Sequence, residues 1–315
     1  MSDYTQKIRE IARKLLSEGK VDVVMGFREG TMPLMAEPCL VTDAAGVDQL
    51  VFNSFCGVNL ANYLPKRKDR IAVVAKGCDS RNMALHIAEN QIKRDQLTII
   101  AAPCTRMVDR RKVALAVDGK DITSVVETNG KLTVTGPGYE KVLDKESVLQ
   151  DNCAICIHRN PVMSDEMLAE PLPEQEVDRY ADVRDVEAMT PAERFAHFQE
   201  LISGCIRCYA CRNACPLCYC PTCFVDESKP QWVGKSDDPT DTLTFHLLRA
   251  FHCAGRCTDC GACERACPVG IKVRRMTKKL EKDCKELFDW ESGMSPDVRP
   301  PLDTFRPDDP GKFIK

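Results

Sequence analysis

The sequence predicts a chain with two parts, an α/β N-terminal domain and a mainly α-helical, loop-rich C-terminal domain. Three observations support this prediction. Strand-like apolar runs alternate with helical patterns in the first half, one cysteine pattern occurs twice in the second half, and 315 residues suit about two domains. A hydrophobic fraction of 43% is ordinary for globular proteins, so each part can bury a core.

The N-terminal half alternates helices and strands. Apolar side chains at helical spacing predict helices over residues 3–18 and 80–93, and a short helix is expected near 139–149. Short apolar runs predict strands at residues 21–27, 49–53, 71–75, 97–101, 112–117 and 131–135.

Cysteines follow two of these strands. Cys78 and Cys104 each come directly after a buried strand, and open α/β sheets place ligands at that carboxyl edge. Farther along, Cys153 and Cys156 form a CxxC pair, which alone indicates a redox dithiol, half of a zinc site or part of a cluster. Together the four thiols predict a [4Fe-4S] site. The alternative is that Cys78 and Cys104 are small buried hydrophobic residues.

Basic residues flank this proposed site in the sequence. Lys76 and Arg81 are candidate contacts to an anionic cluster or to a flavin phosphate, with Arg106 and Arg159 nearby. The alternative is that all of them are solvent-facing charges.

The predicted domain boundaries follow composition. Residues 1–162 form the α/β redox domain, and 163–189 form an acidic linker. A helix then begins at Thr190, because Pro191 suits the first helical position and Glu193 completes a capping box. This helix opens a cluster domain over residues 190–289, and 290–315 form a C-terminal arm rich in Pro and Asp.

The C-terminal half contains one cysteine pattern twice, 52 positions apart. The copies are Cys205-x2-Cys208-x2-Cys211-x3-Cys215-Pro216 and Cys257-x2-Cys260-x2-Cys263-x3-Cys267-Pro268. In this pattern three cysteines ligate one cubane cluster, and the fourth ligates the other cluster of the pair. The predicted ligand sets are therefore Cys205, Cys208, Cys211 and Cys267 for one [4Fe-4S] cluster, and Cys257, Cys260, Cys263 and Cys215 for a second. Zinc explains neither the third cysteine, the proline nor the duplication, so the pattern predicts a ferredoxin-like dicluster domain.

Further cysteines lie between and after the two copies. Cys218, Cys220, Cys223 and Cys253 allow another four-thiolate site, or they pack beside the clusters and tune them. Helices are expected around residues 242–252 and 272–288, and Cys284 lies on the apolar stripe of the second, typical of a core residue.

Composition excludes several classes of protein. A net charge of −3 and a pI near 6.0 give no electrostatic case for binding nucleic acid or a membrane surface. No apolar run is long enough to span a bilayer, and the N-terminus lacks the apolar core of a signal peptide. With nineteen cysteines, these features favour thiolate–metal chemistry in a reducing cytoplasm over disulfides.

The motifs also resemble known families. Residues 20–165 resemble the beta subunits of deazaflavin-coenzyme-dependent hydrogenases and formate dehydrogenases. The motifs that carry this resemblance are Lys76-Gly77-Cys78-Asp79, Pro103-Cys104 and the later CxxC. That resemblance implies a third [4Fe-4S] cluster at Cys78, Cys104, Cys153 and Cys156, and FAD in the α/β domain. No Gly-rich dinucleotide fingerprint is present. Residues 205–287 resemble the dicluster modules of electron-carrying subunits in heterodisulfide-reductase-type complexes.

These features predict an electron-transfer subunit of a cytoplasmic oxidoreductase related to formate dehydrogenase, hydrogenase or heterodisulfide reductase. Its partners would be catalytic and electron-acceptor subunits, without nucleic acid or membrane insertion. The alternatives are a flavin-containing subunit that itself acts on a deazaflavin or nicotinamide coenzyme, and a zinc scaffold without redox function. No general acid–base pair or nucleophile arrangement stands out.

Overall fold

The computed structural model describes residues 2–303, which divide into two compact units. The N-terminal unit contains the chain up to Leu60, Lys66–Ser80 and Ile92–Val177. The C-terminal unit contains Ala61–Pro65, Arg81–Gln91 and the chain from Asp178 onward. The first unit is α/β and the second is largely helical with long loops, which confirms the predicted fold class at this level.

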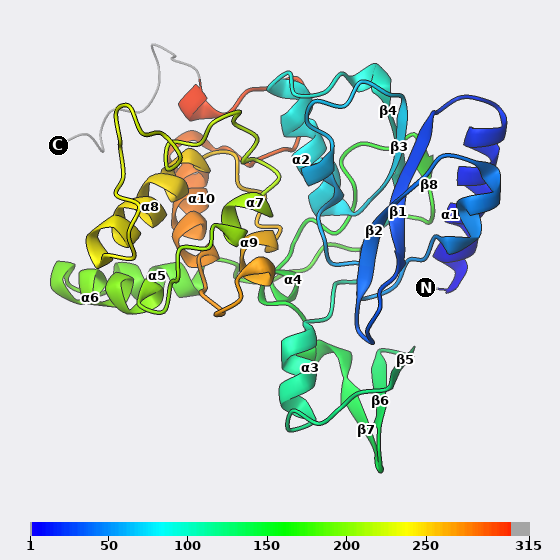
Figure 1. The fold of residues 1–315 in the computed structure, drawn as a ribbon, viewed down its shortest axis with the longest axis horizontal. Helices are drawn as coiled ribbons and strands as arrows, with labels where there is room; N and C mark the ends of the chain where they lie inside the picture. The colour runs from blue at the N-terminus through cyan, green and yellow to red at the C-terminus, as the bar shows by residue number, and fades with distance from the viewer. Residues whose placement is uncertain (1, 304–315) are drawn as a thin grey trace. The chain divides into compact units, whose positions relative to one another are not determined.

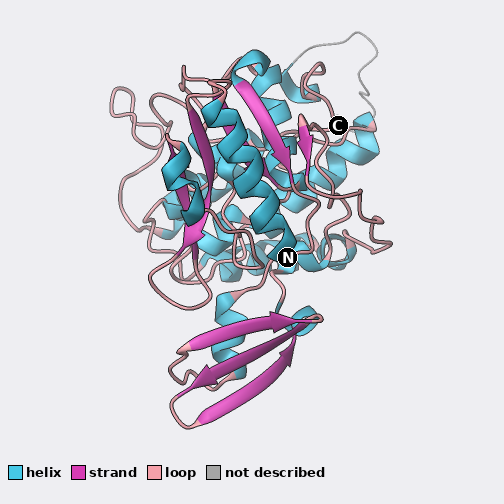
Figure 2. Cartoon of the chain, turned by 90° about the vertical axis from the view of Figure 1, so that its right-hand side faces the viewer, coloured by secondary structure: helices cyan, strands magenta, loops and turns pink. Residues whose placement is uncertain are grey.

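The main sheet of the N-terminal unit has five strands in the order β2-β1-β3-β4-β8 (Figures 1 and 2). Its strands are β1 (Val23–Glu29), β2 (Ala36–Val41), β3 (Ile71–Ala75), β4 (Leu97–Ala101) and β8 (Glu166–Met167), and the unit also contains α1 (Ser2–Ser17). Helix α2 (Gly77–Ala88) begins in this unit, and its residues from Arg81 onward belong to the C-terminal unit. β2 pairs antiparallel to β1, and the other pairings are parallel. Every residue of β3 is buried, which explains its unbroken apolar run.

A smaller antiparallel sheet with its own core belongs to the same unit. The meander β5 (Ser124–Thr128), β6 (Lys131–Gly136) and β7 (Tyr139–Asp144) packs with α3 (Arg110–Ala116), as Figure 2 shows from one side. The shared core consists of the buried side chains Val108, Val113, Val117, Leu132, Val134, Leu143 and Val148.

Three predictions of secondary structure in this unit differ from the structure. Residues 112–116 are helical, because Asp109 caps α3 and Val113 and Val117 recur at helical spacing rather than alternating. Of the helix expected near 139–149, residues 139–144 form a strand, since Gly138 at φ +76° turns the chain back onto β6, and Lys145–Val148 form a short 3-10 helix. The run 49–53 makes only an isolated bridge, between Val51 and Phe27.

The C-terminal unit contains the helices that surround the two cysteine motifs. They are α5 (Ala181–Glu187), α6 (Pro191–Ile202), α7 (Ala210–Asn213), α8 (Pro239–His252), α9 (Ala262–Ala266) and α10 (Arg274–Phe288). The capping box predicted at the start of α6 is confirmed: the Thr190 side chain accepts from the Glu193 N–H, and the Glu193 carboxylate accepts from the Thr190 N–H.

The proposed acidic linker and the arm contain some regular structure. Residues 163–189 include β8 and α5. The arm is described as far as Asp303, and its remaining residues lie outside the described part of the chain. Between residues 2 and 303, no helix combines the length and apolar character needed to cross a bilayer.

Candidate metal centres

The two cysteine motifs have the same backbone conformation. Arg207 and Asp259, each two residues after the first cysteine of its copy, have φ values of +49° and +56°. Tyr209 and Gly261, each four residues after it, have φ values of +58° and +68° and cap α7 and α9. Because left-handed residues are sparse in proteins, two matching pairs make the sequence repeat a structural repeat. α7 and α9 contact each other within the unit.

The first predicted ligand set lines a single cavity. Cys205, Cys208 and Cys211 of the first copy meet Cys267 of the second there, among apolar side chains that include Ile271. The Cys208 side chain is exposed and Cys267 is buried. Burial raises the pKa of Cys211, and the neighbouring Cys205 and Cys267 thiolates add to that increase.

Hydrogen-bond donors surround the sulfurs of this set. The Arg207 N–H lies 3.4 Å from Cys205 Sγ, and the Ile271 N–H lies 3.2 Å from Cys267 Sγ. His246 Nε2 lies 3.2 Å from Cys205 Sγ. Four convergent thiols with N–H donors aimed at their sulfurs fit an anionic iron–sulfur cluster, whose potential such donors modulate.

The four cysteines of the second predicted set are half-buried, and Cys215 has additional neighbours. Burial raises the pKa of Cys263 to about 12, with smaller contributions from Cys215 and Cys260. For Cys257 burial is again the main cause of its raised pKa. Cys215 Sγ, however, lies within 4.8 Å of the Cys218 and Cys253 sulfurs. A cubane holds its ligands at separate corners, so this closer spacing is more typical of thiols around one metal ion.

Of the four extra cysteines, only two approach a ligand position. Cys218 and Cys253 belong to the group around Cys215, which contains neither Cys220 nor Cys223 in the described part of the chain. Cys220 is exposed, and Cys223 packs against a cluster of buried side chains in the insert between the motifs.

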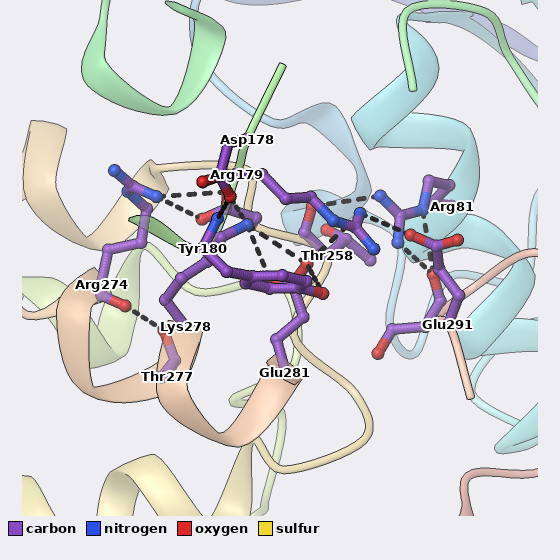
Figure 3. A network of polar contacts seen from close by, with 12 residues as sticks. Arg81, Asp178, Arg179, Tyr180, Thr258, Arg274, Thr277, Lys278, Glu281 and Glu291 are labelled. Carbon is purple, nitrogen blue, oxygen red and sulfur yellow. Dashed lines mark hydrogen bonds and ion pairs between the residues drawn. The ribbon is translucent and has the colours of Figure 1, made fainter. Parts of the chain in front are cut away.

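Helix α10 fixes the second motif through a buried ionic network. Asp259 accepts hydrogen bonds from Arg274 Nη1 at 2.9 Å and Lys278 Nζ at 2.8 Å. Burial would raise the pKa of Asp259, but the two cations outweigh it and the pKa is lowered. Lys278 also pairs with Glu281, and Glu281 accepts from the Tyr180 hydroxyl at 3.4 Å (Figure 3). The loop is therefore held in place by a helix that supplies no cysteine to either set.

In the N-terminal unit, three segments meet at the carboxyl edge of the main sheet. Cys78 lies in the first turn of α2 after β3, and Cys104 follows β4. The Cys104 N–H donates to the Arg159 carbonyl at 2.9 Å, and Arg159 Nε donates back to the Cys104 carbonyl at 3.1 Å. A Cβ at Gly77 would lie 2.3 Å from the His158 carbonyl oxygen, so only glycine fits there.

The two cysteines of the CxxC pair lie on the segment that enters this edge. Cys153 is buried on the short helix α4 (Asp151–Ala154), and Cys156 follows one turn later. Gln175 Nε2 donates to the Cys156 carbonyl at 2.6 Å, which ties the segment to residues beyond the sheet. These backbone contacts agree with the predicted third ligand set, which stays a prediction. That set is Cys78, Cys104, Cys153 and Cys156.

Lys76 and Arg81, the predicted flavin or cluster contacts, are both engaged by protein groups. The Lys76 ammonium is fully buried and lies 2.8 Å from Asp79. Burial opposes its charge, but Asp79 and then the Cys78 and Cys104 thiolates raise its pKa above the ordinary value. Lys76 therefore belongs to the environment of the proposed third cluster.

Arg81 has a different environment, in the C-terminal unit. Its Nε and Nη2 donate to the Ser292 carbonyl at 2.9 and 2.6 Å, and Figure 3 shows it close to Glu291. Neither side chain leaves an obvious donor for a flavin phosphate, so a flavin contact from either residue remains a prediction.

Three residues near these sites were missed from the sequence. Cys56 is fully buried, and burial raises its pKa to about 12 while the Cys104 thiolate adds to it. His246 and Arg249 both approach motif cysteines from α8, the helix that connects the two copies. The spacing of His246 and Arg249, three residues apart on the apolar side of that helix, was the sequence signal that could have identified these two residues.

Comparison with known proteins agrees with the predicted resemblance. No protein-family model matches the chain. The F420-dependent formate dehydrogenase subunit beta of Methanocaldococcus jannaschii is 23% identical over a 362-residue alignment, which covers 94% of this chain and 93% of that protein. The chain resembles formate dehydrogenase beta subunits along nearly its whole length.

A second beta subunit gives the same result. The F420-dependent formate dehydrogenase 1 subunit beta of Methanococcus maripaludis is 24% identical, with coverage of 94% of this chain and 92% of the relative. A solved F420-reducing [NiFe] hydrogenase complex, from Methanosarcina barkeri, matches 49% of this chain and 59% of its own at 14% identity, with a TM-score of 0.39. The resemblance to beta subunits thus includes the cysteine-rich C-terminal half as well as the α/β half.

Proposed function

We propose that the chain is an iron–sulfur electron-transfer subunit of a cytoplasmic multi-subunit oxidoreductase of the formate dehydrogenase, hydrogenase or heterodisulfide-reductase type. One observation supports this most directly: Cys267 of the second motif lies in the same cavity as Cys205, Cys208 and Cys211 of the first. That exchange of the fourth cysteine is what a two-cluster ferredoxin motif requires. The names of the beta-subunit relatives support a place in such a complex, beside catalytic and electron-acceptor subunits.

The chain's own residues would bind the clusters and insulate them. The motif thiolates ligate iron, and bound clusters supply one-electron redox chemistry. Backbone N–H groups such as those of Arg207 and Ile271 donate to ligand sulfurs, and apolar neighbours limit the access of water. In the α/β unit, Lys76 would offset the negative charge of a third cluster at the strand ends.

Iron, acid-labile sulfide and flavin per chain test this proposal in anaerobically purified protein. About twelve irons would support three clusters, whereas about eight would restrict the relay to the C-terminal pair. Zinc in place of iron and sulfide would overturn the proposal and establish a scaffold.

A second function is favoured by the names of the relatives, both of which are beta subunits of F420-dependent formate dehydrogenases. In it, the chain binds FAD and itself exchanges electrons with a deazaflavin or nicotinamide coenzyme. Bound flavin together with cluster reduction by the reduced coenzyme would support this function. If the protein contains clusters but no flavin, and neither reduced coenzyme reduces the clusters, only the electron-relay function remains.

A further inference from the structure

Arg249 is a buried cation with no carboxylate partner. Its side chain is on α8 and the residue is only 5% exposed. Several other buried cations pair with acids, as Lys76 does with Asp79 and Arg274 does with Asp259. Within residues 2–303, Arg249 forms no ion pair, and its Nε has no hydrogen-bond partner. An unpaired buried charge is strongly unfavourable, so a negative group is expected beside it.

Thiols from both predicted ligand sets occupy the position of that negative group. Four cysteines lie near enough to the Arg249 guanidinium to interact with its charge: Cys253, Cys215, Cys263 and Cys211. Of these, Cys211 belongs to the first set, while Cys215 and Cys263 belong to the second. Arg249 Nη2 also donates to the Cys211 carbonyl at 3.0 Å, which fixes the guanidinium beside the first motif.

His246 occupies the preceding turn of the same helix, and among the described residues its ring contacts a thiol of the first set. Its Nε2 is 3.2 Å from Cys205 Sγ. Because a thiolate only accepts hydrogen bonds, the imidazole donates its Nε2–H to the sulfur. Phe245 and Tyr209 pack around this part of α8 and keep it in place.

Both interactions favour the reduced state of a cluster, because an added electron increases the negative charge on the cluster and its sulfurs. The effect of a fixed charge is large in a buried site, where screening by water is weak. Arg249 remains a cation before and after reduction, so no proton accompanies the electron.

We propose that α8 sets the cluster potentials: Arg249 raises the reduction potentials of both C-terminal clusters, and His246 raises only that of the Cys205 cluster. This inference rests on the proposed function, since it requires that both clusters are present. Both are positioning residues, which act on the clusters through charge and hydrogen bonding.

The test is an EPR-monitored redox titration of the purified full-length holoprotein, with dithionite as the electron donor. Arg249→Gln removes the charge, Arg249→Lys keeps it, and Lys285→Gln removes an exposed charge of α10 as a control. A Cys208→Ser variant identifies the signal of the first cluster. We expect Arg249→Gln to lower the ratio of reduced to oxidised cluster about tenfold at a fixed solution potential. This corresponds to a decrease of ~59 mV in the reduction potential of each one-electron couple. Arg249→Lys and Lys285→Gln should stay near the wild-type values.

His246 provides an independent comparison. His246→Phe should lower only the potential of the cluster that Cys208→Ser alters, and His246→Gln, which retains an N–H donor, should recover most of it. Equal shifts of both clusters in His246→Phe would contradict the assignment of His246 to a single cluster.

The remaining outcomes separate this inference from the proposed function. Wild-type protein without iron and sulfide would overturn both. Full iron content with unchanged potentials in Arg249→Gln would overturn the inference alone. If Arg249→Gln loses iron while Arg249→Lys retains it, the charge is needed beside the clusters, as proposed. If Arg249→Lys loses iron as well, Arg249 acts through packing and the inference fails.

Discussion

Lys76 Nζ lies 2.8 Å from the Asp79 carboxylate, and the two side chains are only 2% and 0% exposed. The carboxylate also accepts from the backbone N–H groups of Lys76 and Leu60, at 2.9 and 3.1 Å. This buried pair therefore joins the end of β3 to the first turn of α2, the turn that carries Cys78. Its geometry supports a structural role in addition to any electrostatic effect on the proposed cluster.

Replacing Lys76 should destabilise the protein strongly. Lys76→Met leaves the buried Asp79 carboxylate without its cation, which costs about 3–5 kcal/mol of unfolding free energy. Because Asp79→Asn removes that uncompensated charge, the double variant should recover part of the loss. Urea unfolding of the three variants measures both effects.

An exposed pair provides the matched control for Lys76→Met. Arg13 and Asp48 lie 2.8 Å apart with side chains 43% and 73% exposed, so Arg13→Met should cost about 0–1 kcal/mol. If both Met variants had equally small effects, the folded protein would not depend on the Lys76 cation to stabilise the Asp79 carboxylate.

Cys153→Ser should remove one cluster and leave the other two. If Cys153 is a ligand, the variant should lose about four irons per chain, the content of one cubane. Cys39→Ser is the control, because Cys39 is a similarly buried cysteine on β2 that belongs to no predicted ligand set. Equal iron content in both variants would exclude Cys153 as a ligand.

The sequence was most informative where short-range patterns decide the structure. The capping box at Thr190 predicted the start of α6 to the residue, and the cysteine spacing predicted a repeat whose left-handed positions match. By contrast, residues 112–117 were assigned to a strand because their apolar content fits both periods over so short a segment.

Contacts between distant residues were outside the reach of such patterns. Nothing local indicates that Asp259 meets Arg274 and Lys278, or that Arg249 lies beside cysteines of both motifs. These pairings depend on how α8 and α10 pack around the motif loops. The approach of Cys218 and Cys253 to Cys215 likewise depends on the fold of the insert between the two copies.

Gly261→Ala should be unfavourable, because Gly261 caps α9 at φ +68°. A left-handed conformation costs an alanine about 1–2 kcal/mol, and unfolding free energy should fall by that amount. Gly204→Ala is the control: its φ is not left-handed and the new methyl group would meet only Ile271 Cδ1 at 3.8 Å, so a change below ~0.5 kcal/mol is expected. A similar loss of unfolding free energy in both variants would mean that the left-handed conformation at Gly261 is not the cause of the loss.

His86 should make the stability of the protein depend on pH. The imidazole is fully buried, its Nε2 lies 2.8 Å from the Pro216 carbonyl oxygen, and its Nδ1 has no partner among the described residues. A carbonyl only accepts, so Nε2 carries the proton in the neutral ring. Protonation would add an N–H at Nδ1 with no acceptor.

Burial lowers the pKa of His86, against smaller opposing effects of the Pro216 hydrogen bond and Glu89. As the pH falls below about 6.5, the unfolded chain binds a proton at this residue and the folded chain does not. Stability is therefore lost as the pH falls, by up to about 1.4 kcal/mol per pH unit, until the folded-state pKa is reached. His86→Gln keeps a donor for Pro216 but does not titrate, so the loss between pH 7 and pH 5.5 should be smaller in this variant. Anaerobic urea unfolding at several pH values measures the difference, and parallel curves for the two proteins would show that His86 is protonated equally well in the folded state.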